Sequence, residues 1–414
     1  MSVPESTLPV PLRRNRDFLL LWTGAGATML GARITAIAYP MLVLWHTGSA
    51  VEAGVVGFAA QLPNLLVQIP GGLLVDRYDR RRMMIACDVG CLLATASVAV
   101  VVAAGGFWLP QLVLVAFVQA AFAVIYQLAE RAGVRNLVPA EQLPAALTQN
   151  EARGRAAGLL GQPAGSALFG LLRWAPFAAT AVTHLLSLVS LLLIRKPLRS
   201  ETTRARRPWR HELAEGVAWT WRQRFLRVVL TLIAVSNIPF QVVPLALMVL
   251  VRDSGSSPAV IGLVTGVGGV GGLIGAVNGT WWMRRLNLNA IVVGGLAVWA
   301  LLMAFVAFTS GLVLLSALFA AIAYVGGLFN VCGGVYTVRI TPDELMGRVG
   351  GVATFVSSGT NALGPLVGGV LLDSWGTGRT VGAMSIVMAL LAVAAVLSPT
   401  VRTVSGTEHG RRLV

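Results

Sequence analysis

The sequence contains little charge. Only 12% of the 414 residues are Asp, Glu, Lys or Arg, whereas 56% are hydrophobic. Soluble proteins average about 25% charged residues. So few polar side chains cannot cover the surface of a soluble globule, and a chain this apolar does not remain disordered. The composition therefore excludes both classes and indicates a polytopic membrane protein.

Cysteine is also scarce. The three cysteines, Cys87, Cys91 and Cys332, all lie in apolar runs and offer no disulfide framework. Cys87 and Cys91 share one face of a predicted helix, but no histidine accompanies them, so they indicate helix packing rather than a metal site. The sequence shows no nucleophile–base pair, metal cluster or phosphate-binding loop. We therefore expect neither an enzyme nor a bound cofactor or metal.

Long apolar runs predict an all-α membrane protein of twelve transmembrane helices. Each needs about 21 residues to cross a hydrocarbon layer of ~30 Å, and together they use roughly 250 residues. Too little chain remains for a separate soluble domain. The first run is too long for the apolar region of a cleaved signal peptide. The predicted helices cover residues 18–44, 51–75, 83–105, 109–130, 145–172, 176–194, 225–251, 258–283, 289–309, 311–338, 346–372 and 380–399.

Basic residues divide the chain and orient it. A basic linker, residues 195–224, separates an N-terminal six-helix half, residues 1–194, from a C-terminal six-helix half, residues 225–399; a tail, residues 400–414, follows. All but four of the 32 basic residues lie in the termini, alternate loops or the linker. The exceptions are Arg33, Arg173, Arg252 and Arg379. Because basic loops resist translocation, the basic side is predicted to be cytoplasmic, with both termini inside.

The linker is strongly basic, and the chain carries a net charge of +15. In a soluble protein such a segment would suggest nucleic-acid binding. We reject that interpretation here, because beside membrane helices the charge sets topology and attracts anionic lipid headgroups. Trp209, Leu213, Val217 and Trp221 recur among the charges, which predicts a short helix in the membrane interface.

The two halves resemble each other in sequence. The segment 72–77, after the second predicted helix, has a counterpart 207 residues later, after the eighth. Gly161 and Gly165 recur as Gly364 and Gly368, at an offset of 203. Two parallel repeats of about 200 residues, with six helices each, are typical of transporters whose halves meet around a central site.

The loop between the second and third predicted helices carries the most specific motif. It reads GLLVDRYDRRR from Gly72 to Arg82. Together with twelve helices, a basic linker and the repeat, this loop resembles the signature of the major facilitator superfamily, Gly-x-x-x-Asp-Arg-x-Gly-Arg-Arg. Asp79 replaces the second glycine, as in the branch that resembles enterobactin exporters and macrolide-efflux proteins. The resemblance covers essentially the whole chain and implies the two-half fold of that superfamily.

The resemblance also implies a cytoplasmic latch. Its residues are Gly72, Asp76, Arg77, Arg80 and Glu130. Gly72 would let two helices approach closely. Asp76 would sit at the N-terminus of the eleventh helix, near Met346, where the positive end of the helix dipole favours a carboxylate. Arg80 would pair with Glu130 at the end of the fourth helix. The alternative is a solvated charged loop that serves only topology.

Glycines follow two further patterns. The segment Gly158–Gly165 reads GLLGQPAG, a loose version of a glycine–proline pattern found in exporters of the superfamily. It favours export, although ordinary small-residue packing is the alternative. The segment Gly266–Gly271 reads GVGGVG, the form of a dinucleotide-binding fingerprint. No acidic residue lies between 254 and 342, so we interpret this segment as close helix packing and reject a cofactor.

Polar residues inside the predicted helices are expected to face the bundle interior or a cavity. Arg33 lies near the middle of the first helix, where a charge costs about 2.5–3.5 kcal/mol, so a wet cavity or a carboxylate partner must offset it. For any other single residue, hydrogen bonding between helices is the simpler interpretation, but the set predicts a substrate cavity. Its residues are Arg33, Gln61, Asn64, Gln68, Gln119, Tyr126, Asn237, Gln241, Asn330 and Asn361.

Proton coupling needs a titratable group within the membrane. Among the acids nearest the membrane, none of which lies clearly at the midplane, we choose Asp88, about one turn into the third predicted helix, over Glu52, Glu130 and Glu151. We interpret His184, in the sixth helix, as an interior histidine with satisfied hydrogen bonds rather than as a proton carrier.

Together these features predict a monomeric secondary transporter in a bacterial cytoplasmic membrane. It would export a small amphipathic compound, such as an antibiotic or siderophore, in exchange for protons, by rocking of the two halves around a central cavity. The first alternative is an importer or lipid-translocating member of the same fold; Arg33 as the one midplane charge favours a broader, apolar ligand over a charged nutrient. The second alternative is a non-transporting receptor or scaffold, which the retained latch motif disfavours.

Overall fold

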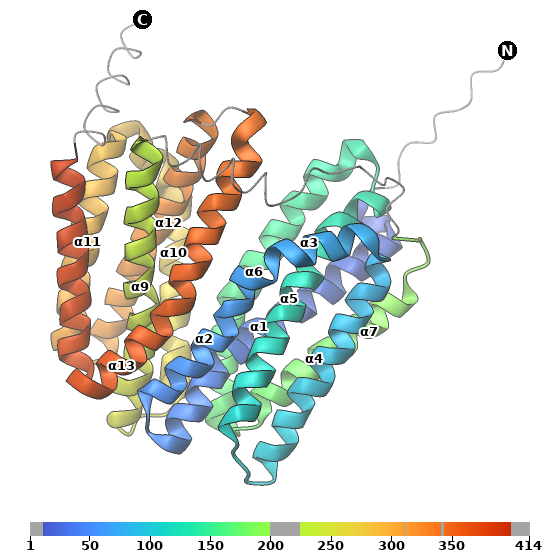
Figure 1. The fold of residues 1–414 in the computed structure, drawn as a ribbon, viewed down its shortest axis with the longest axis horizontal. Coiled ribbons are helices and arrows are strands. Elements are labelled where there is room, and N and C mark those ends of the chain that lie inside the picture. The colour runs from blue at the N-terminus through green and yellow to red at the C-terminus, as the bar shows by residue number, and fades with distance from the viewer. Residues whose placement is uncertain (1–10, 199–223, 310, 341–342, 399–414) are drawn as a thin grey trace, which may run out of the picture. The chain divides into compact units, whose positions relative to one another are not determined.

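The structure is a computed structural model that is helical throughout the part of the chain it describes (Figure 1). The described residues are 11–198, 224–309, 311–340 and 343–398. In this part, nine helices are long and apolar enough to cross a membrane, or ten when α2 (Ala50–Leu66) and α3 (Gln68–Arg77) count as one broken span. These apolar helices, without a strand among the described residues, confirm the predicted all-α membrane fold.

The first part of the chain matches the predicted helices in order. One departure has a clear cause: the second predicted helix is interrupted at Val67, between α2 and α3. Pro70 has no amide hydrogen, and its ring excludes the carbonyl of Leu66 four residues earlier. The remaining elements are η1 Leu12–Arg14, α1 Arg16–Thr47, α4 Arg80–Ala103, α5 Leu109–Leu137, η2 Ala140–Gln142, α6 Leu143–Leu171 and α7 Ala175–Leu193.

In the second part of the chain, two predicted helices share one element. α13 (Asp343–Leu397) covers both 346–372 and 380–399, and its helical backbone is broken at Gly376, with φ 75° and ψ 171°. Glycine adopts this conformation because it has no Cβ to clash. The other helices are α9 Arg224–Asp253, α10 Ala259–Arg285, α11 Leu288–Phe308 and α12 Leu312–Ile340. The interfacial helix predicted around Trp209–Trp221 and the predicted tail lie outside the described residues.

The helices form two compact units. The first comprises residues 1–38 and 66–204, and the second comprises residues 39–65 and 205–414. The hairpin of α1 and α2, from Tyr39 onward, therefore packs with the C-terminal helices in the second unit. The two halves predicted from the linker are defined by sequence, and their boundaries stay a prediction.

In the first unit, α4 packs against both α5 and α7. The unit's core contains Phe18 and Leu21 of α1, Met84 of α4 and Leu191 of α7, each at most 1% exposed. Lipid tails are as apolar as these side chains, so the packing stabilises the unit mainly through close contact rather than through removal from water. This core fixes the positions of the helices that carry the candidate site.

Glycines bring α10 and α12 of the second unit into backbone contact. A Cβ added at Gly271 would strike the carbonyl of Ala320, and one added at Gly275 would strike the carbonyl of Tyr324. Both glycines are buried. The glycine-rich segment is therefore the packing surface of a helix, which confirms the interpretation made from the sequence.

The glycines repeated at an offset of 203 make equivalent contacts in the two units. In the first unit, a Cβ added at Gly165 of α6 would lie 3.0 Å from the Cα of Ile34 in α1. In the second unit, one added at Gly368 of α13 would lie 3.3 Å from the Cα of Val242 in α9. Each glycine allows its helix to approach the first helix of the same sequence half. The sequence repeat is thus a repeat of packing.

Candidate functional site

Asp88 of α4 is the centre of a buried hydrogen-bond network in the first unit. The residue is 1% exposed. Its Oδ1 lies 2.9 Å from Nδ1 of His184 and accepts a hydrogen bond from the Thr28 hydroxyl at 3.1 Å. Its Oδ2 accepts a hydrogen bond of 2.6 Å from the Ser187 hydroxyl. One carboxyl group therefore joins α1, α4 and α7.

A fourth helix joins this network through Tyr126 of α5. Its hydroxyl lies 3.0 Å from Oγ of Ser187. Because Ser187 donates its single proton to Asp88, Tyr126 must be the donor in this pair. Eight residues separate Asp88 from the start of α4 at Arg80, about 12 Å along the helix axis. Asp88 therefore lies about two turns into the helix rather than one, because α4 begins three residues earlier than predicted.

The local sequence explains why these groups meet. His184 and Ser187 are three residues apart in α7, so both lie on the face that contacts α4. Cys87 and Cys91 flank Asp88 on α4, and both are buried free thiols. Their small side chains belong to the packing around the carboxylate, as the sequence predicts. The network is therefore built from helix faces of the first unit alone.

His184 is the direct partner of Asp88 and is itself buried. A buried carboxylate without partners is costly, and the groups that face Asp88 offset this cost. His184 is 2% exposed, and its Nε2 has no hydrogen-bond partner in the described part of the chain. His184 is therefore an interior histidine, as the sequence predicts, but only one of its two ring nitrogens is bonded. Asp88 and His184 therefore form one directly bonded, buried pair.

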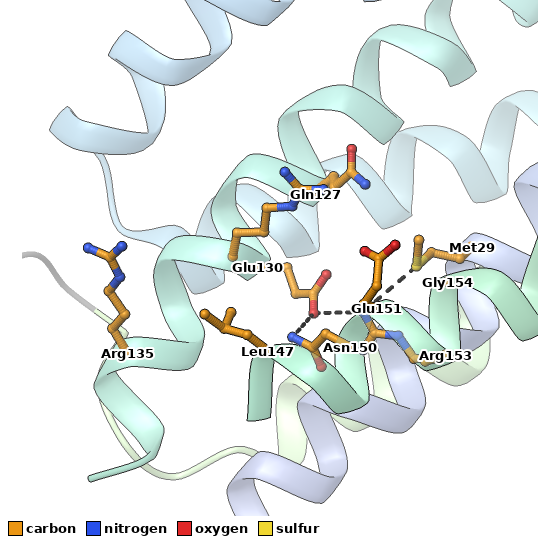
Figure 2. Close-up of a pocket in the computed structure, with 10 residues that line it drawn as sticks. Met29, Gln127, Glu130, Arg135, Leu147, Asn150, Glu151, Arg153 and Gly154 are labelled. Atoms are coloured by element: carbon orange, nitrogen blue, oxygen red, sulfur yellow. Dashed lines mark hydrogen bonds and ion pairs between the residues drawn. The ribbon is translucent and has the colours of Figure 1, made fainter. Parts of the chain in front are cut away.

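A second buried charge pair, between Glu130 and Arg153, lies at a pocket (Figure 2). Nη2 of Arg153 lies 2.8 Å from Oε1 of Glu130, and the two side chains are 6% and 4% exposed. The Asn150 amide donates to the same carboxylate oxygen at 3.2 Å. Nη1 of Arg153 donates to the carbonyl of Trp22 at 3.0 Å. The pair therefore ties α5 and α6 to α1.

The pocket beside this pair has a volume of about 430 Å³. That size lies in the usual range for small-molecule sites, about 300–1,000 Å³. Its walls carry both signs of charge, and one of the acids, Glu151, also pairs with Arg155 at 3.2 Å on the surface. The lining residues are Met29, Gln127, Glu130, Arg131, Arg135, Leu147, Asn150, Glu151, Arg153 and Gly154 (Figure 2).

The predicted pairing of Arg80 with Glu130 is wrong. Nη1 of Arg80 instead donates to Oδ1 of Asn136 at 2.6 Å and to the carbonyl of Ala132 at 3.2 Å. Both acceptors lie in the last two turns of α5, four residues apart on the same face of the helix. Glu130 is neutralised by Arg153 from α6, so it needs no second arginine. Arg80 is thus a residue that joins α4 to α5.

Two other residues of the signature loop are anchored within the first unit. The Asp79 carboxylate accepts a hydrogen bond from the Arg82 amide at 3.0 Å and so caps the N-terminus of α4. This explains how a carboxylate serves where the signature has glycine. Arg81 donates to the carbonyls of Leu191 and Leu192, both at 2.8 Å, at the C-terminus of α7.

Gly72 does not make the close helix contact predicted for it. A Cβ added at Gly72 would meet nothing within 4 Å among the described residues, whereas one at its neighbour Gly71 would lie 3.3 Å from Leu128 of α5. Asp76 and Arg77 are exposed. The side chain of Met346 lies outside the described residues, so the latch at Asp76 stays a prediction.

Five of the predicted cavity residues are exposed or half-buried and make no hydrogen bond to another helix. Arg33, Gln68 and Asn330 are exposed and make no hydrogen bond or ion pair with the residues that the structure describes. Gln61 and Asn64 are half-buried, and the Asn64 amide donates to the Gln61 side chain at 3.3 Å. The role of these five residues in a substrate cavity stays a prediction.

The other predicted cavity residues take part in contacts between helices. Gln119 is 4% exposed and donates to α1 at 2.9 Å, and Tyr126 belongs to the Asp88 network. In the second unit, Asn237 donates to α13 at 3.3 Å, and Gln241 donates to the carbonyl of Asn361 at 3.4 Å. For Gln119, Tyr126, Asn237 and Gln241 the structure favours the packing alternative over the cavity. The contact of Asn361 is made by its main-chain carbonyl, so a cavity role for its side chain stays a prediction.

Comparison with protein families decides among the expected classes. The model of the Major Facilitator Superfamily matches residues 21–250 and 240–413, which is nearly the whole chain. The chain belongs to the Major Facilitator Superfamily. The resemblance drawn from the loop 72–82 is thereby confirmed, as is the expectation of a membrane transporter rather than an enzyme.

Individual proteins match this chain over different lengths. The multidrug efflux pump Tap of Mycolicibacterium fortuitum is 27% identical over 400 residues, 93% of this chain and 96% of the pump. Macrolide efflux protein A of Streptococcus pyogenes is 28% identical over 128 residues, 30% of this chain and 31% of that protein. The crystal structure of the nucleoside transporter NupG is similar with a TM-score of 0.74 at 13% identity, over 92% of this chain and 98% of that one. This last likeness concerns the fold alone.

Proposed function

We propose that the protein exports a small amphipathic compound from the bacterial cytoplasm in exchange for protons, by alternating access. Similarity to a multidrug efflux pump over 93% of the chain supports export. The observation that carries the proton coupling is the Asp88 carboxylate, 1% exposed within an apolar helix and bonded to His184. Buried titratable groups in membrane helices are costly, and they mark proton and substrate pathways.

Protonation of Asp88 changes the hydrogen bonds that join four helices. As a carboxylate, Asp88 accepts from Thr28 and Ser187 and faces His184. A protonated carboxyl group has a donor of its own and fewer acceptor positions, so part of this set must rearrange. Proton binding therefore acts directly on the contacts of α4 with α1 and α7, and through Ser187 on Tyr126 of α5.

The charged groups around the network favour Asp88 as the coupling acid over Glu130. Glu130 lies one turn along α5 from Tyr126 but is held by Arg153 at 2.8 Å. The Arg153 guanidinium offsets the charge of the Glu130 carboxylate, so we assign Glu130 to a structural ion pair. Asp88 has a histidine, His184, as its partner at 2.9 Å instead of an arginine. The two buried acids thus have different roles, one structural and one in coupling.

The proposed substrate class follows from the predicted cavity residues whose side chains are exposed and unbonded in the described part of the chain. Arg33 is the one charged residue assigned to the cavity, and Gln68 and Asn330 are neutral. A few polar groups among apolar helices suit a compound that is largely apolar with a polar end. A charged nutrient would need several fixed counter-charges. We therefore propose an amphipathic substrate, bound through many weak contacts.

We also propose a sidedness for the transporter. All but four basic residues fall on one predicted side, which supports two cytoplasmic termini. The basic linker would then lie at the inner leaflet and bind anionic lipid headgroups. We expect the protein to act as a monomer, because the predicted cavity is built within one chain.

Reconstitution in liposomes tests export coupled to protons. Liposomes with an acidic interior are diluted into neutral buffer that contains ethidium, an amphipathic dye. Protons leaving through the transporter are expected to drive the dye inward against its gradient, and a protonophore is expected to abolish this accumulation. Accumulation that persists with the protonophore would contradict proton coupling. No accumulation of ethidium, a macrolide or a tetracycline above protein-free liposomes would contradict multidrug export.

The predicted latch is tested separately at Asp76. We expect Asp76→Asn to lower dye transport by up to about fivefold, since an exposed carboxylate at a helix N-terminus contributes about 0.3–1 kcal/mol. The amount of protein in the membrane should not change, because Asp76 is exposed. Transport rate per inserted molecule is the measurement. An unchanged rate would favour the alternative of a solvated loop that only sets topology.

A further inference from the structure

The tip of the α1–α2 hairpin is held by a carboxylate from a distant part of the chain. Asp373 of α13 accepts hydrogen bonds from the amides of Ala50, at 2.8 Å, and Val51, at 3.0 Å. It also accepts one from the Ser49 hydroxyl at 2.9 Å. All four residues belong to the second unit. More than 320 residues separate the two sides of this contact.

The contact is a docking contact rather than part of the folding of α2. The first amides of a helix have no partner inside the helix, and their positive end attracts a carboxylate. α2 already has a cap from its own sequence, because the Ser49 hydroxyl accepts the Glu52 amide at 3.2 Å. Asp373 therefore adds bonds that α2 does not need in order to be a helix. These bonds hold the start of α2 against α13.

An arginine holds the other side of the same hairpin tip. Nη1 of Arg252, at the end of α9, donates to the carbonyls of Leu44, at 3.3 Å, and Gly48, at 2.5 Å. Its Nη2 pairs with Asp253 at 2.8 Å. The guanidinium thus binds carbonyls at the C-terminal end of α1, where the Leu44 carbonyl also accepts the Gly48 amide at 3.1 Å. Arg252 is also one of few basic residues on the predicted outer side, where basic residues are disfavoured.

Beneath these charges the backbones are in close contact. Ala50 and Ala53 of α2 are 1% and 0% exposed. A Cβ added at Gly54 would strike the carbonyl of Pro365, and one added at Gly369 would strike the carbonyl of Ala50. The hairpin is therefore interlocked with α13 over at least one turn, and the polar bonds lie at the exposed end of this contact.

We propose that Asp373 and Arg252, with the groups of residues 44–51 that they bind, form an outer clasp whose release opens the outer face of the transporter. This inference rests on the proposed alternating access. The hairpin comes from the six helices before the linker, whereas α9 and α13 come from the six after it. When one six-helix set moves against the other, these bonds must break, and they must re-form later in the same transport cycle.

The chemistry of the outer clasp suits repeated opening. Asp373 is exposed, so water replaces each of its hydrogen bonds when the clasp opens. The opening cost stays small, because no charge is left buried without a partner. Loss of one charged partner should therefore shift the balance toward the open form without unfolding the second unit. Charge-assisted bonds of this kind shift such a balance about tenfold.

Access to a buried position under the clasp measures its opening. Ala53→Cys places a thiol at a site that is 0% exposed, and the native cysteines are all buried. Purified protein in lipid nanodiscs is treated with N-ethylmaleimide, which reaches both membrane faces. We expect Asp373→Asn and Arg252→Gln each to raise the labelling rate of this thiol about tenfold.

Two other charges of the predicted outer side serve as matched controls. Glu52→Gln removes a carboxylate from the first turn of α2, and Arg379→Gln removes another arginine of the predicted outer side. Neither side chain makes a hydrogen bond or ion pair with the described part of the chain. Both should leave the labelling rate within about twofold of the parent. Equal rates in Asp373→Asn and the parent, or an increase in both controls as large as in Asp373→Asn, would overturn the clasp.

A second variant protects the test against misfolding. Ser49→Ala removes one hydroxyl from the clasp, and it should raise the labelling rate by less than Asp373→Asn does. In the double variant the two increases should not multiply, because both remove the same contact. Full multiplication would contradict the assignment. The measurement needs neither dye nor proton gradient, so a protein that labels as expected but moves no dye would overturn the proposed function alone.

Discussion

Asp88→Asn is expected to reduce proton-driven dye accumulation to the level of protein-free liposomes. Asparagine has nearly the shape of aspartate; its one oxygen can accept from one of the two hydroxyls, Thr28 or Ser187, while its amide donates to the other, so the four helices should stay packed. It cannot take up a proton. Dye exchange down its own gradient should therefore continue while the response to the pH gradient is lost. The measurement is ethidium accumulation with and without the gradient.

Asp79→Asn is the matched control for this result. It removes a carboxylate from the start of the same helix, and asparagine caps a helix as well as aspartate does. We expect it to retain proton-driven accumulation. Full proton-driven accumulation by Asp88→Asn would show that another group carries the proton. Loss of downhill exchange as well would point to a structural role for Asp88 and contradict its role in coupling.

Arg153→Met is expected to cause the largest loss of stability. It leaves the Glu130 carboxylate buried with only the Asn150 amide beside it. Breaking a buried pair in this way costs about 3–5 kcal/mol. We expect the melting temperature in detergent to fall by roughly 10 °C, the change that such a loss produces in a unit of this size. Thermal unfolding followed by circular dichroism provides the measurement.

A double variant separates the charge from the packing. Replacing both partners, as in Glu130→Gln with Arg153→Met, leaves no uncompensated charge and should recover most of the stability. Glu151→Gln is the control, because its pair with Arg155 is about two-thirds exposed and worth little. If Arg153→Met alone were as stable as Glu151→Gln, the pair would not be the tie between α5, α6 and α1 described above.

The helices could be predicted from the sequence because their signal is local. Twelve apolar runs and the basic linker can be recognised without any knowledge of packing. The break at Val67 was not predicted, although Pro70 is a local signal that explains it. The break between the last two predicted helices, 346–372 and 380–399, is present in α13, where Gly376 has non-helical backbone angles. The glycines of α10 could be assigned to packing because no acidic residue follows them.

The site was only half predictable, because its partners are far apart in the sequence. Asp88 stands out as a lone acid in an apolar run, but its partner His184 lies 96 residues away, and a histidine in a helix gives no sign of what it faces. The pairing of Glu130 failed for the same reason. Several arginines were within reach of the end of α5, and only the packing of α6 selects Arg153 over Arg80.

The central claim is that the Asp88–His184 pair binds the proton that is exchanged for substrate. Its most direct test is proton release on substrate binding, recorded with a pH indicator in weakly buffered detergent solution. The wild type is expected to release protons when ethidium is added, and Asp88→Asn is expected to bind ethidium without releasing any. Equal proton release from both proteins would contradict the account.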